Sequence, residues 1–297
     1  MTREITTVLK DLSYLEGPRW HEDRIWVADF YTHQVLSARE DGSDLHVEAE
    51  VPNQPSGLGW LDDGRLLVAS MRDRTLLRRE TDGTLVTHAD LDDHVTGHLN
   101  DMVVDAQGRA FLGHFGFDIM GGAPVEPASV LRIDPDGTVN EVADDLWFPN
   151  GSAITDDQTL LVAETFGNQI TAFDITPEGM LTRRRAWARF GERPTEREVG
   201  KALAQVSVGP DGCCLDAEGA LWIADAVNGR LIRVREGGDI IEEIQPGTGV
   251  FACMLGGSDG RTLFACAAPD FQEENRKNAR EASLLAIRVD VPRAGLP

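Results

Sequence analysis

The stretch that decides the fold is Ser56-Gly-Leu-Gly-Trp-Leu-Asp-Asp-Gly-Arg-Leu-Leu-Val-Ala-Ser70, in which two apolar segments flank a tight Asp-Gly turn. Glycine supplies the positive φ angle that such a turn requires, so the stretch predicts a β-hairpin. The same order of features, a polar or small residue, an apolar strand, a turn and a second strand, recurs along the chain. The repeats begin at Glu16, Ser56, Asn100, Asn150, Asp211 and Ala252. The repeats start 40, 44, 50, 61 and 41 residues apart; the shorter intervals suit a propeller blade and the longer ones a blade with an insertion.

A second set of turns follows the first within the repeats, for example Glu40-Asp-Gly, Thr81-Asp-Gly and Pro135-Asp-Gly. Two hairpins per repeat amount to about four strands, which is the make-up of one propeller blade. Sustained helical periodicity is nearly absent, and the one convincing helical turn signal lies at 195–205. The sequence therefore predicts an all-β, six-bladed β-propeller with four-stranded antiparallel blades.

The last repeat needs a further strand to close the ring. The segment Glu4-Ile-Thr-Thr-Val-Leu9 is apolar, β-prone and otherwise unassigned. We expect it to join the last blade, next to the strand that starts at Ser283, because closure removes exposed strand edges. A domain boundary inside the chain would break the ring, so we assign residues 1–297 to a single domain.

Composition limits the partners that this chain can bind. The 297 residues carry a formal net charge of −22, which argues against nucleic acid and anionic membranes because both are bound largely through Lys and Arg. No segment near the start resembles a signal peptide and no apolar run could span a bilayer, so we expect a cytoplasmic protein, monomeric or weakly dimeric. The cysteines lack zinc-site spacing, and we expect buried, reduced thiols. They are Cys213, Cys214, Cys253 and Cys266.

The first residues of the six repeats form a ring around the propeller axis, because the innermost strand of each blade lines the central channel. We call these six the axial residues. Each of these residues precedes or starts its strand, so their side chains can converge at one channel mouth. Two carboxylates (Glu16, Asp211) and two carboxamides (Asn100, Asn150) form an oxygen-rich site of the kind that Ca²⁺, Mg²⁺ and Mn²⁺ prefer. Capping of the strands is the alternative for any one position, although Glu is a poor turn residue.

A second ring of equivalent positions lies at the ends of the next strands: Asp29, Ser70, His114, Glu164, Asp225 and Cys266. We expect these side chains to satisfy backbone donors between blades, while Glu164 and Asp225 could also orient the axial residues. His98 stands two residues before Asn100, at the rim, where it can contact a substrate. Two long insertions, 115–127 and 193–207, are expected to cover the mouth as lids, although the second could equally be a plain surface loop.

Five motifs spread over nearly the whole chain carry a family resemblance: Leu15-Glu-Gly-Pro-Arg-Trp, Leu99-Asn-Asp-Met-Val-Val-Asp, Phe148-Pro-Asn-Gly-Ser-Ala, Gly209-Pro-Asp-Gly-Cys-Cys-Leu-Asp and Cys253-Met-Leu-Gly-Gly. Together they resemble the SMP-30/gluconolactonase/luciferin-regenerating-enzyme-like family. The resemblance implies a six-bladed propeller with one catalytic divalent metal ion, Ca²⁺ first and Mg²⁺, Mn²⁺, Zn²⁺ or Fe²⁺ as alternatives. It implies that Glu16, Asn150 and Asp211 ligate the metal and that Asn100 contacts the substrate or the metal.

One position departs from the family pattern. His98 stands where sugar lactonases of the family often carry an arginine, two residues before the matching asparagine. Imidazole is shorter and titratable, and it cannot present the same fork of donors as a guanidinium group. The departure argues against gluconolactone itself as the substrate, and much less against lactone hydrolysis.

We therefore expect a metal-dependent hydrolase that opens a small lactone, a sugar lactone or a related compound. The metal would polarise the carbonyl or lower the pKa of a bound water, and Asp211 is the candidate general base. Asn100 and His98 would position the substrate. Two alternatives stay open: a phosphotriesterase-like hydrolase that uses the same metal site, and a non-catalytic propeller whose metal is structural and whose faces bind a partner.

Overall fold

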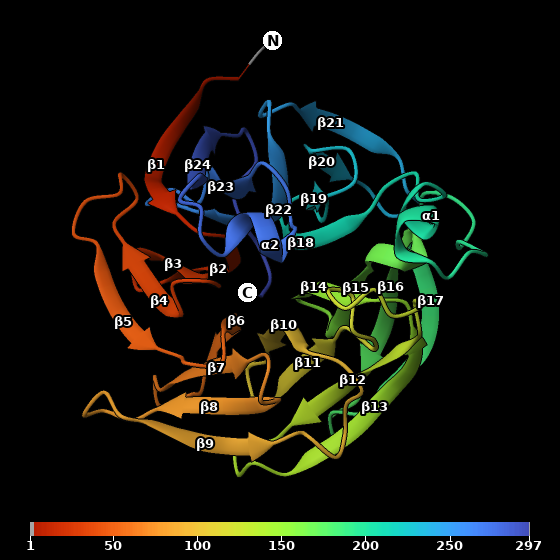
Figure 1. The fold of residues 1–297 in the computed structure, drawn as a ribbon, viewed down its shortest axis with the longest axis horizontal. Coiled ribbons are helices and arrows are strands. Elements are labelled where there is room, and N and C mark those ends of the chain that lie inside the picture. The colour runs from red at the N-terminus through yellow and green to blue at the C-terminus, as the bar shows by residue number, and fades with distance from the viewer. Residues whose placement is uncertain (1–2, 297) are drawn as a thin grey trace.

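The computed structural model describes residues 3–296 and arranges their strands in six four-stranded antiparallel sheets around a central axis (Figure 1). Each sheet begins with the strand that carries one of the repeat-start residues, and this strand is the innermost of its blade. The predicted six-bladed propeller with four-stranded antiparallel blades is confirmed.

The strands follow the sequence repeats blade by blade. The first two blades are β2 (Leu15–His21), β3 (Arg24–Asp29), β4 (Gln34–Ala38) and β5 (His46–Glu50), then β6 (Pro55–Trp60), β7 (Leu66–Ser70), β8 (Thr75–Arg79) and β9 (Leu85–Asp90). The next two are β10 (Leu99–Val104), β11 (Ala110–His114), β12 (Ala128–Ile133) and β13 (Val139–Leu146), then β14 (Pro149–Ile154), β15 (Thr159–Glu164), β16 (Gln169–Ile175) and β17 (Leu181–Arg189). The last two are β18 (Pro210–Leu215), β19 (Leu221–Asp225), β20 (Arg230–Val234) and β21 (Ile240–Ile244), then β22 (Gly249–Gly256), β23 (Thr262–Ala268), β24 (Ala282–Arg288) and β1 (Ile5–Leu12).

The N-terminal strand closes the ring, as predicted. β1 pairs antiparallel with β24, with Ile5 opposite Ile287 and Leu12 opposite Ala282. The strand is three residues longer at its C-terminal end than the expected segment 4–9. Because the first strand of the chain completes the last blade, the two ends of the chain are tied into one sheet and β24 is not left as the exposed outer edge.

The core lies between neighbouring blades, where the sheets pack face to face. One apolar cluster joins Leu36 of the first blade, Trp222 of the fifth and Phe264 of the sixth, all 3% exposed or less. All four cysteines are buried and free, which confirms the expectation of reduced core thiols. The packing makes each blade depend on its neighbours, so the ring behaves as a continuous apolar layer around the axis.

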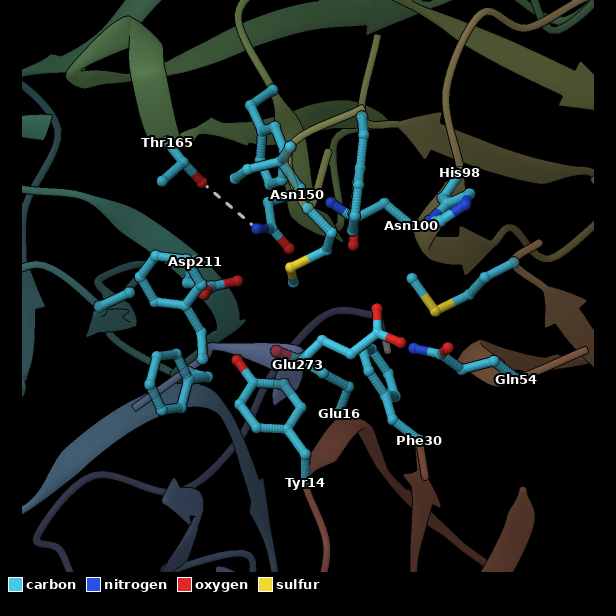
Figure 2. A pocket seen from close by; sticks show the side chains of 18 of the residues that line it. Tyr14, Glu16, Phe30, Gln54, His98, Asn100, Asn150, Thr165, Asp211 and Glu273 are labelled. Atoms are coloured by element: carbon cyan, nitrogen blue, oxygen red, sulfur yellow. Dashed lines mark hydrogen bonds between the residues drawn. The ribbon is translucent and has the colours of Figure 1, made fainter. Parts of the chain in front are cut away.

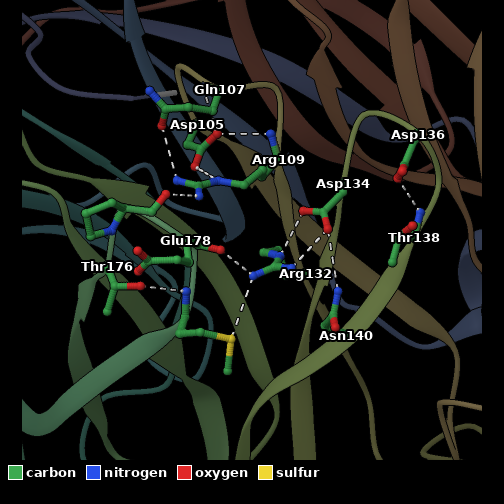
Figure 3. Close-up of polar contacts among 12 residues, drawn as sticks. Asp105, Gln107, Arg109, Arg132, Asp134, Asp136, Thr138, Asn140, Thr176 and Glu178 are labelled. Atoms are coloured by element: carbon green, nitrogen blue, oxygen red, sulfur yellow. Dashed lines mark hydrogen bonds and ion pairs between the residues drawn. The ribbon is translucent and has the colours of Figure 1, made fainter.

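Hairpin turns add polar contacts between blades (Figure 3). Arg109 of the third blade donates from Nε to Asp105 Oδ2 at 2.7 Å and from Nη1 to the carbonyl of Pro177 at 2.9 Å. Arg132 donates from Nη1 to the carbonyl of Glu178 at 2.7 Å. Two arginines of the third blade therefore hold the β16–β17 turn of the fourth through its backbone carbonyls.

Helical structure within residues 3–296 is limited to short segments: η1 (Thr165–Gly167), α1 (Val199–Leu203) and α2 (Glu273–Arg276). α1 confirms the helical turn signal at 195–205, whereas α2 carries no comparable signal. No helix in this part of the chain has the length and apolar character needed to cross a membrane.

The C-terminal residues run across the ends of the inner strands. Ile154, the last residue of β14, exchanges backbone hydrogen bonds with Leu296 at 2.7 and 2.9 Å. Ala294 N–H donates to the carbonyl of Leu215, the last residue of β18, at 3.0 Å. In Figure 1 the C-terminus accordingly lies near the centre of the ring. The tail therefore covers the channel end at which the inner strands finish, opposite the end at which they start.

Candidate functional site

Every inner strand has an irregular register at the position that carries its axial residue. The shifts relative to the neighbouring strand lie at 16–19, 55–58, 99–102, 149–152, 210–213 and 250–252. Such irregularities re-aim a side chain and are common beside active sites. Glu16, Asn100, Asn150 and Asp211 all line one cavity at the channel mouth, and Figure 2 shows them around a common centre. The four polar residues of the predicted ring are thus brought together.

Glycine follows the axial residue in four blades, and close packing requires it there. A Cβ atom at Gly57 would lie 2.7 Å from the backbone nitrogen of Met102, and one at Gly151 would lie 2.6 Å from that of Cys213. Inner strands of neighbouring blades therefore approach backbone to backbone, which only glycine permits. In the third blade the equivalent position is Asp101.

Asp101 forms a buried ion pair that sequence reasoning missed. Its Oδ1 accepts a hydrogen bond from Arg19 Nη2 at 2.6 Å, and the two side chains are 7% and 4% exposed. Arg19 Nε also donates to the carbonyl of Leu58 at 3.1 Å, and Nη2 to that of Met102. Burial raises the pKa of the Asp101 carboxyl, and the Arg19 guanidinium partly offsets this. The pair therefore places an additional ionisable group beside the axial residues.

The axial carboxylates lie in an environment that disfavours two negative charges. Glu16 is 8% exposed and Asp211 is 7% exposed. Burial, followed by the nearby Asp211 and Asp101, raises the pKa of Glu16 well above its usual range. Burial and Asp101 do the same to the pKa of Asp211. Buried like charges are unfavourable unless a cation lies between them, so this pair calls for a positive partner.

The two axial carboxamides present their oxygens to the same place. Asn150 Nδ2 donates to Thr165 Oγ1 at 3.2 Å, and Asn100 Nδ2 donates to the carbonyl of Pro149 at 3.0 Å. With both amide nitrogens engaged, the amide oxygens remain available. Asp211 Oδ1 is buried and has no hydrogen-bond partner within residues 3–296.

This donor set fits a hard divalent cation, which prefers carboxylate and amide oxygens. No group of three or more His, Cys, Asp or Glu side chains in the described residues could hold a metal ion, so the carboxamides are needed to complete the set. The axial residues contribute neither thiolate nor imidazole, which favours Ca²⁺, Mg²⁺ or Mn²⁺ over softer metals.

His98 is half-buried and lines the same cavity, as predicted. Burial and the nearby Arg72 lower its pKa, which favours the neutral imidazole. The residues that stand two positions before the axial residue in other repeats, Tyr14, Gln54 and Phe148, line the cavity as well. Sequence reasoning missed these three, although the offset of His98 from Asn100, applied to the other repeats, would have found them.

The second predicted ring acts on the backbone. Asp29, Glu164 and Asp225 are fully buried. They accept hydrogen bonds from the backbone N–H groups of Tyr14, Trp147 and Gly209 at 3.0, 2.7 and 3.0 Å, respectively. The expectation that strand-end residues satisfy backbone donors is therefore confirmed for these three and for His114, which accepts from the backbone N–H groups of Gly116 and Ser129. It is wrong for Ser70, whose buried Oγ has no hydrogen-bond partner within residues 3–296. Within residues 3–296 the hydrogen bonds of Glu164 and Asp225 do not reach an axial side chain, so these carboxylates fix the chain that leads into each inner strand.

The residue after each member of this second ring faces the cavity in most blades. These residues are Phe30, Met71, Phe115, Thr165 and Ala226. Much of the cavity wall therefore comes from two repeated positions: two residues before each axial residue, and one residue after each member of the second ring. The wall residues, like the axial residues, occupy equivalent positions in successive repeats.

Both predicted insertions cover the mouth and contact each other. Val125 N–H donates to the carbonyl of Arg197 at 2.7 Å, and the Arg197 side chain pairs with Glu126. Ile119 from the first insertion and Leu203 of α1 from the second line the cavity. The alternative of a plain surface loop for the second insertion is therefore wrong, because this loop forms part of the cavity wall.

A third segment, 269–281 with α2, also contributes to the mouth and was not predicted. It supplies Phe271 and Glu273 to the lining. Glu273 Oε1 accepts a hydrogen bond from Arg72 Nη2 at 2.8 Å, and Arg72 Nε donates to Gln54 Oε1 at 2.7 Å. The whole cavity measures about 290 Å³, and one side of its rim is formed by this polar chain.

Comparison with known proteins agrees with this geometry. The family model described as the SMP-30/Gluconolactonase/LRE-like region matches residues 15–268. Pentonolactonase XacC of Haloferax volcanii is 27% identical over 293 residues, which cover 95% of this chain and 92% of that protein. The 6-deoxy-6-sulfogluconolactonase of Pseudomonas putida is 26% identical over 316 residues, with 100% and 99% covered. A solved luciferin-regenerating enzyme has the same fold, with a TM-score of 0.80 at 16% identity over 99% of this chain and 98% of that one. The chain belongs to the SMP-30/gluconolactonase/LRE-like family.

Proposed function

We propose that the protein is a lactonase that opens a small cyclic ester with the help of one divalent cation, Ca²⁺ in preference to the others. The observation that carries this proposal is the meeting of two buried carboxylates and two carboxamides at the wall of one cavity. Two relatives named as lactonases, each matched over more than nine-tenths of both chains, support the reaction class.

In this proposal Glu16, Asn150 and Asp211 hold the cation and Asn100 lies beside it. The free Oδ1 of Asp211 and the two amide oxygens supply neutral and anionic oxygen donors together. When bound, the cation supplies Lewis acidity, which favours charge development on a carbonyl oxygen or ionisation of water.

The chain's own residues carry the proton transfers and the positioning. Asp211 accepts the proton of the attacking water, because its carboxylate lines the cavity beside the place of the ester. The water oxygen bonds to the carbonyl carbon, the ring C–O bond breaks, and the proton passes to the departing alkoxide, which gives a hydroxy acid. Asn100 and His98 hold the ester, and the contacting insertions shield it from bulk water.

A lactone panel tests this proposal. Chelated protein receives Ca²⁺, Mg²⁺, Mn²⁺, Zn²⁺ or Fe²⁺ one at a time, and a pH indicator reports hydrolysis of simple γ- and δ-lactones, sugar lactones, an aryl lactone and a phosphotriester. We expect turnover of at least one lactone, loss of turnover on chelation, and loss in Glu16→Gln. Glu22→Ala serves as the control, because Glu22 is exposed and follows the other end of the strand that carries Glu16.

Other outcomes point to the alternatives. Faster turnover of the phosphotriester than of every lactone would favour phosphoryl chemistry at the same residues. Folded protein that binds a cation yet hydrolyses nothing in the panel would favour a binding propeller with a structural metal. Full activity of the Glu16→Gln variant would contradict the proposed cation site.

A further inference from the structure

We propose that the substrate is a lactone whose ring carries an apolar body, an aryl or alkyl group of about the size of a phenyl ring, in place of the hydroxyl groups of a sugar lactone. This inference rests on the proposed function, and it concerns the part of the cavity that surrounds the reacting ester. Three observations support it: the aromatic walls of the cavity, the hydrogen bonds that its polar side chains already make, and the volume of the cavity.

Aromatic side chains form two walls of the cavity. In the first wall the ring of Tyr14 lies 5.2 Å from that of Phe30 and 5.0 Å from that of Phe251, measured between centroids. In the second wall Phe148 lies 4.6 Å from Phe115 and 5.5 Å from Phe166. These rings come from four different blades and offer apolar surface to any ligand beside the axial residues. Figure 2 shows two of them, Tyr14 and Phe30, close to Glu16.

Several polar side chains of the lining already form hydrogen bonds with one another or with the backbone. Thr165 Oγ1 accepts from Asn150 and donates to the carbonyl of Pro210 at 2.8 Å. Arg72 bridges Gln54 and Glu273 along one side of the rim. Outside the axial set, the hydrogen-bonding capacity that remains belongs to His98, the hydroxyls of Tyr14 and Tyr31, and the free atoms of the Gln54–Arg72–Glu273 chain at the rim. A sugar lactone placed against the aromatic walls would bury hydroxyl groups away from these polar groups, which is unfavourable.

The volume leaves room for more than the ester ring. A dry apolar cavity of about 150 Å³ admits benzene, and this cavity measures about 290 Å³. The space therefore accommodates a lactone ring together with one further ring or a short alkyl chain. Burial of that group against the aromatic walls favours binding in proportion to the apolar area removed from water.

Binding of lactam analogues tests the inference apart from turnover, because lactams are not hydrolysed under these conditions. Calorimetry at two temperatures compares 5-phenylpyrrolidin-2-one, pyrrolidin-2-one and gluconolactam with the calcium-loaded protein. We expect the phenyl lactam to bind at least about tenfold more tightly than pyrrolidin-2-one, with a negative heat-capacity change that marks apolar burial. Tighter binding of gluconolactam than of the phenyl lactam would overturn the inference.

Turnover then measures the same preference in the reaction. The ratio of kcat/KM for γ-phenyl-γ-butyrolactone to that for γ-butyrolactone should exceed about ten, and Phe271→Ala should reduce this ratio at least about threefold. Phe190→Ala is the matched control, because Phe190 is also half-buried but lies outside the cavity; it should leave the ratio unchanged. A glucono-δ-lactone rate above that of δ-valerolactone would overturn the inference while leaving the lactonase proposal intact. If no lactone is hydrolysed, the lactonase proposal fails, and the calorimetric comparison still decides whether the cavity selects apolar bodies.

Discussion

The two ends of the inner strands offer a comparison within the same elements. At the end where the strands start, a cavity of about 290 Å³ contains converging carboxylates and carboxamides. At the end where they finish, a cavity of about 420 Å³ is bordered by Trp20, Trp60 and Leu296. The rings of His21 and Trp60 stack there at 4.0 Å, and the C-terminal tail hydrogen-bonds to the strand ends.

The larger cavity is thus not the better candidate site. At the far end the buried carboxylate of Asp216 is paired, since its Oδ2 accepts from Arg233 Nε at 2.6 Å. At the near end Asp211 Oδ1 is buried without a hydrogen-bond partner in the described residues, and burial and charge repulsion raise the pKa of two carboxylates. The comparison indicates that buried carboxylates without a positively charged partner, rather than cavity volume, mark the candidate site.

The largest expected effect is on activity at the near end. Asp211→Asn removes the proposed base, so kcat/KM for the best lactone should fall by about 10²–10⁴-fold, measured with saturating Ca²⁺. The control is Asp216→Asn, five residues along the same chain segment and at the other end of β18. It should lower stability by about 1–3 kcal/mol through its lost ion pair and leave kcat/KM within about twofold. Equal losses of activity in both variants would erase the distinction between the ends.

The largest expected effect on stability comes from the buried ion pair between Arg19 and Asp101. Asp101→Ala leaves Arg19 buried without its carboxylate, and we expect the free energy of unfolding to fall by about 3–5 kcal/mol. Urea unfolding measures this change. The double variant Arg19→Met with Asp101→Leu should recover a large part of the loss, because no unpaired charge remains. A single variant as stable as the wild type would show that the pair contributes nothing.

The free energy of unfolding should also depend on pH through His114, which lies at the near end. Burial, with a smaller contribution from Arg74, lowers the pKa of His114 to about 4, below its unfolded value of about 6.5. The unfolded chain therefore binds the proton first as pH falls, and stability present above about pH 6.5 is lost between there and about pH 4. The expected loss from this group is about 2 kcal/mol at pH 5. His114→Gln should show a correspondingly smaller fall between pH 7 and 5 in urea unfolding; an unchanged slope would contradict the assignment.

The smallest effect is expected at the tail. Truncation after Asp290 removes the backbone hydrogen bonds of Arg293, Ala294 and Leu296, with an expected loss of about 1–2 kcal/mol because ordering the tail offsets part of their contribution. The kcat/KM for lactones should stay within about twofold, since the tail lies at the far end. A large loss of activity in a folded truncated protein would show that the two ends are coupled.

The sequence was sufficient to predict the blades, the closing strand and the axial residues, because all of them follow from one repeat. Tyr14, Gln54 and Phe148 could have been found as well, since they share the offset that singled out His98. The ion pair of Arg19 and Asp101 could not, because Asp101 stands where four of the other repeats have glycine and its partner belongs to another blade. Phe271 and Glu273 lie in a segment outside the repeat, so only long-range packing brings them to the cavity.

The central claim is that the axial residues hold a divalent cation, and thermal unfolding with and without Ca²⁺ tests it most directly. Chelated wild-type protein at pH 8 keeps two buried carboxylates that repel each other, so Ca²⁺ should raise its Tm. Glu16→Gln removes one charge and should unfold at a higher Tm than wild type when chelated, yet gain less from Ca²⁺. An equal rise in both proteins, or no rise in wild type with any divalent cation, would contradict the account.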